Sequence, residues 1–304
     1  MILGVDIGGT CVKMGLVDQS GVLHARHEAS VCFDGYQTPI LTTVIHQTRG
    51  FLQQTGADVQ GIGVSATGQI DEALGMVAGT NGKIPHYEGA QIRRSMEAAL
   101  GKPVWVLNDA NAAVLGECFA GRGKGFRHVL MVTLGTGVGG GIVLDGRPLS
   151  GARGFAGEIG HFTLYQNGLP CACGKRGCFE NYASTSALVR RVQEKTGAQL
   201  SGREIFAQAA NGDRNIQEAL DGWMDDIAAG ITGLVHLLNP EIVLIGGGVS
   251  VQEELLMAPL RKRILQGVMP RFAEGLRVAS AALGNDAGMI GAAHYCMERL
   301  GMRR

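Results

Sequence analysis

Three cysteines and one histidine have the residue types and the spacing of a metal site. Cys171, Cys173 and Cys178 fall within eight residues, and His161 lies ten positions before the first of them. Three thiolates and one imidazole make the ligand set of a closed tetrahedral zinc site. Cys171 and Cys173 are separated by one residue and pair poorly as a disulfide, whereas a metal takes ligands from one short loop readily. The alternative, three buried thiols and an unrelated histidine, fits the surrounding glycines and cationic residues less well.

Such a zinc ion would hold structure and leave catalysis to other groups. Four protein ligands leave no open position for a reacting water. Two carboxylates flank the cysteine loop, Glu158 on one side and Glu180 on the other. Because a loop tied by a metal keeps neighbouring groups in fixed positions, we expect a binding site for a small polar ligand beside the zinc.

Two glycine-rich turns have the features of phosphate-binding loops. Residues 5–10 read Val-Asp-Ile-Gly-Gly-Thr and residues 132–137 read Val-Thr-Leu-Gly-Thr-Gly, each after an apolar strand and before a hairpin. Successive backbone N–H groups without bulky side chains can curl around phosphate oxygens. Neither turn is a Walker A loop or a dinucleotide fingerprint. Because the same device returns after about half the chain, we expect two similar domains facing each other across a cleft.

Asp6 and Asp109 are the carboxylates with a candidate role in phosphoryl transfer. Asp6 ends the first strand, where it would hold Mg2+ directly or through water; a turn-forming aspartate is the alternative. Asp109 stands between a strand at 103–107 and a helix at 110–120. Its position alone leaves a helix N-cap and a catalytic base equally open. A helix and a strand then lead into the second glycine turn, so the chain can bring Asp109 to the same site, which favours the base.

Periodicity and turn residues predict an alternation of strands and helices. The helix at 221–238 is expected to lie in the core between the domains. Ser201 is expected to cap a helix. The glycines at 246–248 are expected to let a flat nucleotide base lie against the backbone. Strands are expected at 2–6, 12–18, 22–28, 60–66, 103–107, 129–134, 142–144, 241–245 and 277–283, and helices at 39–54, 110–120, 184–195, 204–210, 221–238, 251–265 and 287–300.

Composition narrows the class of protein. The 304 residues carry 27 basic and 27 acidic side chains, so the overall charge gives no reason to expect nucleic acid or a membrane surface as partner. No run of eighteen apolar residues occurs, and no charged leader precedes Ile2. Seven cysteines, an odd number, suit a reducing compartment. We expect a cytoplasmic globular protein, and the 48 glycines indicate backbone that approaches a ligand.

With these motifs in order, the chain resembles the ROK family of sugar kinases over essentially its whole length. The most specific part is Glu158-Ile159-Gly160-His161 followed by the cysteine loop. The resemblance implies an α/β, actin-like ATPase (hexokinase-type) fold with two similar domains around a central cleft, usually as a homodimer. We expect an N-terminal domain at 1–120, with the helix at 288–304 packing back on it, and a larger C-terminal domain at 121–287 that contains the zinc loop 161–178.

The resemblance also implies roles for individual residues. The reaction would be ATP-dependent phosphorylation of a hexose or N-acetylhexosamine at O6, with glucose the first candidate and N-acetylmannosamine the second. The cofactors would be ATP, Mg2+ and structural Zn2+. The general base would be Asp109. The sugar would be bound by Gly68, Asn81, Asn108, Asp109, Glu158, His161 and Glu180, and zinc by His161, Cys171, Cys173 and Cys178. The nucleotide and its metal would be bound by Asp6, Gly8, Gly9, Thr10, Lys13, Gly135, Thr136, Gly137, Gly139 and Gly247.

Two segments depart from the family pattern. Family members often carry Gly-x-Pro-Gly where this chain has Ser65-Ala66-Thr67-Gly68, and an Asn-Leu-x-x-Trp-like segment where it has residues 81–87. Both should border the sugar, so the identity of the sugar stays open. A sugar-responsive regulator of the same family is a second reading, which the start of the phosphate strand at Ile2 disfavours because it leaves no room for a helix-turn-helix domain. A sugar-binding protein without kinase turnover is a third.

Overall fold

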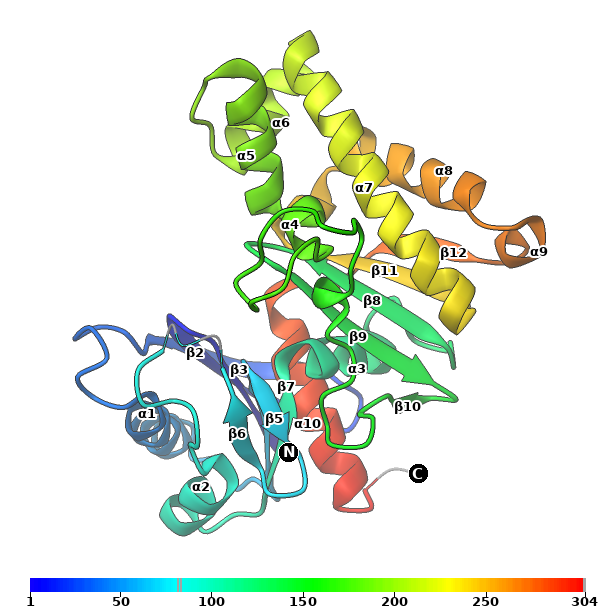
Figure 1. The fold of residues 1–304 in the computed structure, drawn as a ribbon. Coiled ribbons are helices and arrows are strands. Elements are labelled where there is room, and N and C mark those ends of the chain that lie inside the picture. Colours follow the sequence, from blue (N-terminus) through cyan, green and yellow to red (C-terminus); the bar gives the residue numbers. More distant parts are fainter. Residues whose placement is uncertain (81, 83, 303–304) are drawn as a thin grey trace.

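The computed structural model describes residues 1–80, 82 and 84–302. Its first half is built on a five-stranded sheet with the order β3-β2-β1-β4-β7 (Figure 1). β1 pairs antiparallel with β2 and parallel with β4, so the chain turns back once and then crosses over. The strands are β1 Ile2–Ile7, β2 Cys11–Val17, β3 Leu23–Ser30, β4 Ile62–Ala66 and β7 Val104–Asn108, beside a separate hairpin of β5 Gln69–Asp71 and β6 Met76–Gly79.

The second half repeats this arrangement. Its sheet has the order β10-β9-β8-β11-β12, and β8 again pairs antiparallel with the next strand and parallel with the one after the crossover. The expected repeat of strand, glycine turn and hairpin is therefore present in the sheets themselves. The strands are β8 Val129–Leu134, β9 Val138–Leu144, β10 Arg147–Pro148, β11 Ile242–Gly246 and β12 Arg277–Ser280.

Helices cover each sheet and supply its core. In the first half α1 and α2 pack beside the sheet, and Val44, Phe51 and Met96 join its buried apolar cluster. In the second half the long helix α7 lies along the core with α5, α6 and α8 around it (Figure 1). The bounds are α1 Ile40–Thr55, α2 Ile92–Leu100, α4 Glu180–Ala183, α5 Thr185–Thr196, α6 Gly202–Ala210, α7 Arg214–Leu238, α8 Ala258–Gly267 and α9 Pro270–Ala273.

Two further helices, α3 (Asp109–Ala120) and α10 (Ala287–Arg299), join the halves. α10 packs on α3 and on strands β1 and β4, and its Ala292 and Tyr295 share a buried cluster with Met131 and Val143 of the second sheet. The start of α3 lies directly on β9, because a side-chain carbon at Gly141 would come within 2.5 Å of the Ala110 carbonyl oxygen. The domain boundaries themselves stay a prediction.

Several expected elements are wrong in extent or place. The helix expected at 221–238 begins seven residues earlier, at Arg214, because Asp213 caps it there. It was expected to lie between the domains, whereas its buried residues belong to the core of the second half. The helix expected at 251–265 is interrupted, since regular α-helix starts only at Ala258, just before Pro259. Helix α2 and the β5–β6 hairpin were not expected.

Two strands also end differently. The strand expected at 277–283 stops at Ser280, because the backbone N–H groups of Ala282 and Leu283 donate to the Glu117 carboxylate at 2.8 and 2.7 Å. The strand expected at 142–144 begins four residues earlier, at Val138, so the second glycine turn is limited to 135–137 and the glycines at 139–141 belong to β9. Gly139 and Gly141 allow the close approach of α3, and Gly140 allows that of Ile159. Among the described residues, none of the helices combines the length and the apolar character that crossing a membrane requires.

Candidate active site

Asp109 lies where strand β7 ends and α3 begins. The helix is capped by the preceding residue, since the Asn108 side-chain oxygen accepts from the Ala110 N–H at 2.9 Å. Asp109 Oδ1 accepts from the same N–H at 2.8 Å, and the neighbouring Thr67 side chain acts on the carboxylate and lowers its pKa. Burial, reinforced by the charges of Asp6 and Glu158, raises the pKa of Asp109 to about 6. The side chain has the setting of a general base that is ionised at neutral pH.

Asp6 occupies the corresponding end of β1. It faces Lys13 across the hairpin register, and its Oδ1 accepts from the Ser65 hydroxyl at 2.6 Å. Burial raises the pKa of Asp6, while the Ser65 hydrogen bond and the Lys13 charge lower it. Directly after Asp6, the chain turns through Gly8, Gly9 and Thr10. The Gly8 N–H donates a hydrogen bond to the Cys11 carbonyl oxygen at 3.0 Å. A hard carboxylate oxygen at this point suits Mg2+.

The second glycine turn lies at the end of β8. Gly135, Thr136 and Gly137 form it, and the Thr185 N–H at the start of α5 donates to the Gly135 carbonyl at 2.8 Å. Gly247, after β11, lies against the Leu134 carbonyl that opens the turn. Gly139 lies beyond the turn, paired with Thr133 inside β9. The structure thus brings Gly247 to the turn and leaves Gly139 in the sheet.

The candidate sugar residues approach Asp109 from several elements. The Gly68 carbonyl accepts from the Asn108 side-chain amide at 2.9 Å, which ties the turn after β4 to the last residue of β7, directly before Asp109. Glu158 is exposed and its charge acts on Asp109. The backbone at Gly157 just before it rests on β9 and on the first turn of α3. Asn81 lies outside the described residues.

The four expected zinc ligands converge. The ligand atoms of His161, Cys171, Cys173 and Cys178 all lie within 4.8 Å of one another. Cys173 Sγ and Cys178 Sγ are 3.6 Å apart, and Cys171 Sγ lies 3.7 Å from His161 Nδ1. A tetrahedron with Zn–S bonds of about 2.3 Å has S–S edges of about 3.8 Å, so these separations fit a zinc ion at the centre.

Glu180 links this cluster to the second glycine turn. It begins α4 two residues after Cys178, and its Oε2 accepts from the Val138 N–H at 3.1 Å. The aromatic ring of Phe179 between them stacks on Phe162 with ring centroids 5.0 Å apart. The cysteine loop is therefore fixed to the core on one side and to the turn on the other.

The structure adds residues that the sequence analysis did not assign. Ser65 and Thr67 contact the two aspartates, as described above. Tyr87 is 2% exposed, its hydroxyl has no hydrogen-bond partner among the described residues, and the charges of Asp109 and Asp6 act on it. The side-chain amide of Asn111, in the first turn of α3, is likewise buried without a partner in the described part of the chain. The two departures from the family pattern, at 65–68 and at 81–87, were the signals available for Ser65, Thr67 and Tyr87, and the sequence analysis gave no signal for Asn111.

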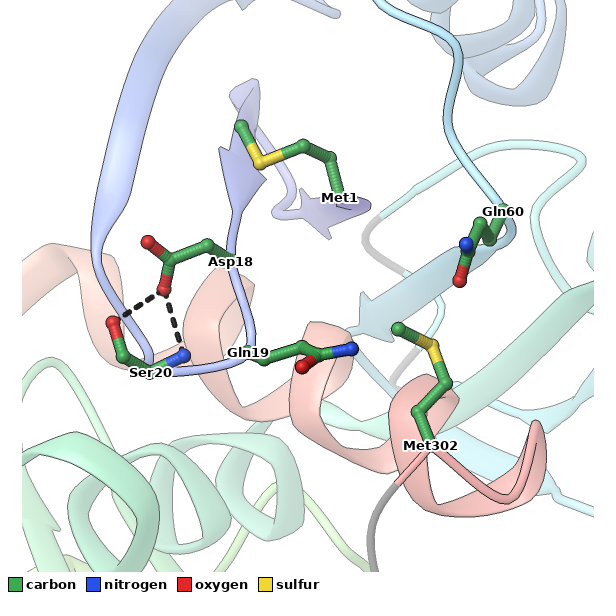
Figure 2. A pocket seen from close by; sticks show the side chains of 6 residues that line it. All are labelled: Met1, Asp18, Gln19, Ser20, Gln60 and Met302. Carbon is green, nitrogen blue, oxygen red and sulfur yellow. Dashed lines mark hydrogen bonds between the residues drawn. The ribbon is translucent and has the colours of Figure 1, made fainter.

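A separate surface hollow lies at the opposite end of the first sheet (Figure 2). Met1, Asp18, Gln19, Ser20, Gln60 and Met302 line it. The Asp18 carboxylate is occupied by the hairpin turn, because it accepts from the Ser20 N–H at 2.8 Å and the Ser20 hydroxyl at 2.6 Å. Met1 and Asp18 flank the strand ends away from Asp6, so this hollow is separate from the candidate site.

The chain belongs to the ROK family, whose model matches residues 2–299. It is 33% identical to a glucokinase from Thermotoga maritima over 99% of this chain and 98% of that protein. The structure of a ROK family glucokinase from Streptomyces griseus in complex with glucose and AMPPNP is similar, with a TM-score of 0.83, 32% identity and coverage of 97% and 98%. A putative N-acetylmannosamine kinase from Listeria monocytogenes has a TM-score of 0.84, 29% identity and coverage of 98% and 99%. The expected actin-like ATPase fold is confirmed.

Proposed function

We propose that this ATP-dependent sugar kinase transfers the γ-phosphoryl group of ATP to O6 of a hexose or N-acetylhexosamine, with glucose the first candidate acceptor and N-acetylmannosamine the second. The observation that carries the proposal is the setting of Asp109. Its carboxylate lies at a strand end and accepts from the Ala110 N–H, the charges of Asp6 and Glu158 act on it, and burial raises its pKa to about 6. A base with this pKa is ionised at neutral pH and basic enough to accept a hydroxyl proton.

The reaction then needs positioning more than covalent chemistry from the protein. Glu158, Glu180 and His161 would hold the sugar hydroxyls, so that the acceptor oxygen faces Asp109. As that oxygen attacks the γ-phosphorus, its proton passes to the Asp109 carboxylate and ADP leaves. The backbone N–H groups of the glycine turns would stabilise the charge on the phosphate oxygens.

Magnesium would be held at Asp6, directly or through water. When bound, Mg2+ offsets phosphate charge. Lys13, opposite Asp6 on the hairpin, supplies a fixed positive charge at the same end of the sheet. Zinc at the cysteine cluster would be structural, and a homodimer is the proposed assembly.

The test is ADP release by the purified protein with Mg-ATP and each of glucose, mannose, fructose, allose, N-acetylglucosamine and N-acetylmannosamine. Release that depends on one sugar, and that Asp109→Asn abolishes while sugar binding persists, supports the kinase and identifies its substrate. Asp213→Asn is the matched control, because Asp213 caps α7 away from the site and asparagine caps equally well. It should turn over like the parent protein.

The position of transfer needs its own measurement. The 6-deoxy analogue of the active sugar should bind and yet support no ADP release, and phosphorus NMR of the product should show a primary phosphate ester. An ester at another oxygen would refute O6. Sugar binding without ADP release from zinc-loaded protein would favour the alternative, a sugar-responsive regulator or a sugar-binding protein of this family without kinase turnover.

A further inference from the structure

We infer that Ser65 and Thr67, at the end of β4, are positioning residues that each hold one carboxylate of the site: Ser65 holds Asp6 and Thr67 holds Asp109. The inference rests on the proposed function, which it deepens by adding two hydroxyl groups to the parts that align the reaction. Neither residue touches the reacting atoms in this scheme. Each acts through the aspartate beside it.

The sheet order places the two hydroxyls correctly. β4 lies between β1 and β7, the strands that end in Asp6 and lead into Asp109. Asp6 is the register partner of Ser65, and Ala66 is the partner of Asn108, so Thr67 and Asp109 each follow directly after the last registered pair of β4 and β7. Side chains two apart on a strand point to the same face. The β4 end therefore presents one hydroxyl toward each neighbouring carboxylate.

Among the described residues, the Ser65 hydroxyl makes one hydrogen bond, to Asp6. The residue is fully buried, and its Oγ donates to Asp6 Oδ1 at 2.6 Å. Helix α10 covers both groups, because a side-chain carbon at Gly288 would come within 3.0 Å of Asp6 Oδ1 and of Ser65 Oγ. With water kept away on that side, the hydroxyl satisfies an oxygen that would otherwise be buried without a donor.

Thr67 is held at both ends. Its backbone N–H donates to the Ile7 carbonyl at 3.1 Å, which fixes it to the strand that leads into the first glycine turn. Its side chain acts on the Asp109 carboxylate, whose Oδ1 accepts from the Ala110 N–H at 2.8 Å. A Thr67 hydroxyl donor would, together with the Ala110 N–H of α3, restrict rotation of the carboxylate and leave its remaining lone pairs for the acceptor hydroxyl.

The two hydroxyl groups also offset the repulsion between the carboxylates of Asp6 and Asp109. Asp6 and Asp109 are like charges that act on each other in a buried setting. A neutral hydroxyl donor stabilises each carboxylate without adding a positive charge that would compete for the phosphates.

The test compares Thr67→Val, which removes the hydroxyl at nearly constant shape, with Thr67→Ser, which keeps it. With the sugar that supports ADP release, we expect Thr67→Val to lower kcat about tenfold and to change the sugar Kd less than about twofold. Thr67→Ser should stay within about threefold of the parent kcat. The matched control is Thr48→Val on α1, which removes a buried hydroxyl that has no partner among the described residues and should leave kcat unchanged. A Thr67→Val kcat within twofold of the parent, or a Thr67→Ser loss as large as that of Thr67→Val, overturns the inference for Thr67.

A thermal double-mutant cycle tests the contacts without turnover. Thr67→Val should lower Tm in the parent protein and change it much less in an Asp109→Ala background. Ser65→Ala should behave in the same way toward Asp6→Ala. Equal Tm shifts in both backgrounds would contradict the contacts even in an active kinase. If no sugar supports ADP release, the proposed function fails while the two cycles still decide whether the hydroxyls hold the carboxylates.

Discussion

The Glu180 carboxylate accepts a hydrogen bond from the Val138 backbone N–H at 3.1 Å. Glu180 follows the last cysteine of the metal cluster by two residues, and Val138 directly follows the second glycine turn. The contact therefore joins the cysteine loop to the backbone that we propose to bind phosphate. Loss of order in the loop should reach that turn through this hydrogen bond.

Removal of one zinc ligand should therefore affect folding and catalysis together. We expect Cys173→Ser to bind less than one zinc per chain, to melt at lower temperature and to show higher KM values for sugar and ATP, because zinc binding contributes about 10 to 16 kcal/mol in model peptides. Metal analysis, calorimetry and steady-state kinetics measure these three effects. Cys32→Ser, outside the cluster, should keep its zinc. A stable and fully active metal-free protein would refute the structural zinc.

Asp109→Asn should make the protein more stable at neutral pH while it abolishes turnover. The pKa of Asp109 is about 6 in the folded protein and 3.8 as its ordinary value, so the folded state binds more protons between these values. Stability from this group falls as the pH rises through that window. We expect the variant to gain about 1 to 3 kcal/mol in the free energy of unfolding at pH 7.5 and to gain little near pH 4. Urea titrations at both pH values measure the difference, and a loss of stability at pH 7.5 would contradict the assignment.

The pH dependence of turnover should report the same group. Only the ionised Asp109 accepts a proton, so kcat/KM should fall about tenfold per unit below pH about 6 and level off above it. A kinetic profile between pH 5 and pH 8, with protein stability checked at each point, measures this limb. An acidic limb centred near the ordinary carboxyl pKa would mean that a different or more exposed group is the base.

Tyr87→Phe should separate ligand binding from stability. The Tyr87 hydroxyl is buried without a hydrogen-bond partner in the described residues. Its loss removes no hydrogen bond among those residues, so the Tm of the ligand-free protein should stay the same or rise. The charges of Asp109 and Asp6 act on the Tyr87 hydroxyl, so we expect bound ligand to supply its hydrogen-bond partner. The sugar KM of Tyr87→Phe should therefore rise about tenfold. Tyr295→Phe, which loses a hydrogen bond from Arg299, should instead lower Tm at constant sugar KM. An unchanged KM in Tyr87→Phe would exclude the contact.

Glu117→Gln should destabilise the connection between α3 and the segment after β12. Glu117 is fully buried, and its two oxygens accept three backbone N–H groups, from Arg122, Ala282 and Leu283. An amide cannot accept at both ends, so one donor loses its partner, and we expect a loss of about 2 to 4 kcal/mol in urea unfolding. The exposed Glu218→Gln, which breaks a surface ion pair with Lys195, should change stability by less than about 1 kcal/mol.

The sequence by itself determined the features that depend on short spacing. The cysteine loop, the two glycine turns and the place of Asp109 between a strand and a helix are all local, because ligand spacing, backbone freedom and helix starts are set by a few neighbouring residues. The repeated turn was enough to predict two similar sheets, and both sheets have the same strand order. The matching order of motifs then led to the family.

Tertiary structure decided the contacts between elements that are distant in the chain. Thr67 meets Asp109, and Ser65 meets Asp6, only because β4 lies between β1 and β7 in the sheet. The strand after β11 ends early because Glu117, far upstream, takes the next two N–H groups. The apolar periodicity of helix α7 would be the same whether the helix packed between two domains or inside one. Such outcomes depend on which apolar faces and hydrogen-bond partners meet after the chain has crossed over, and local patterns carry no information on that choice.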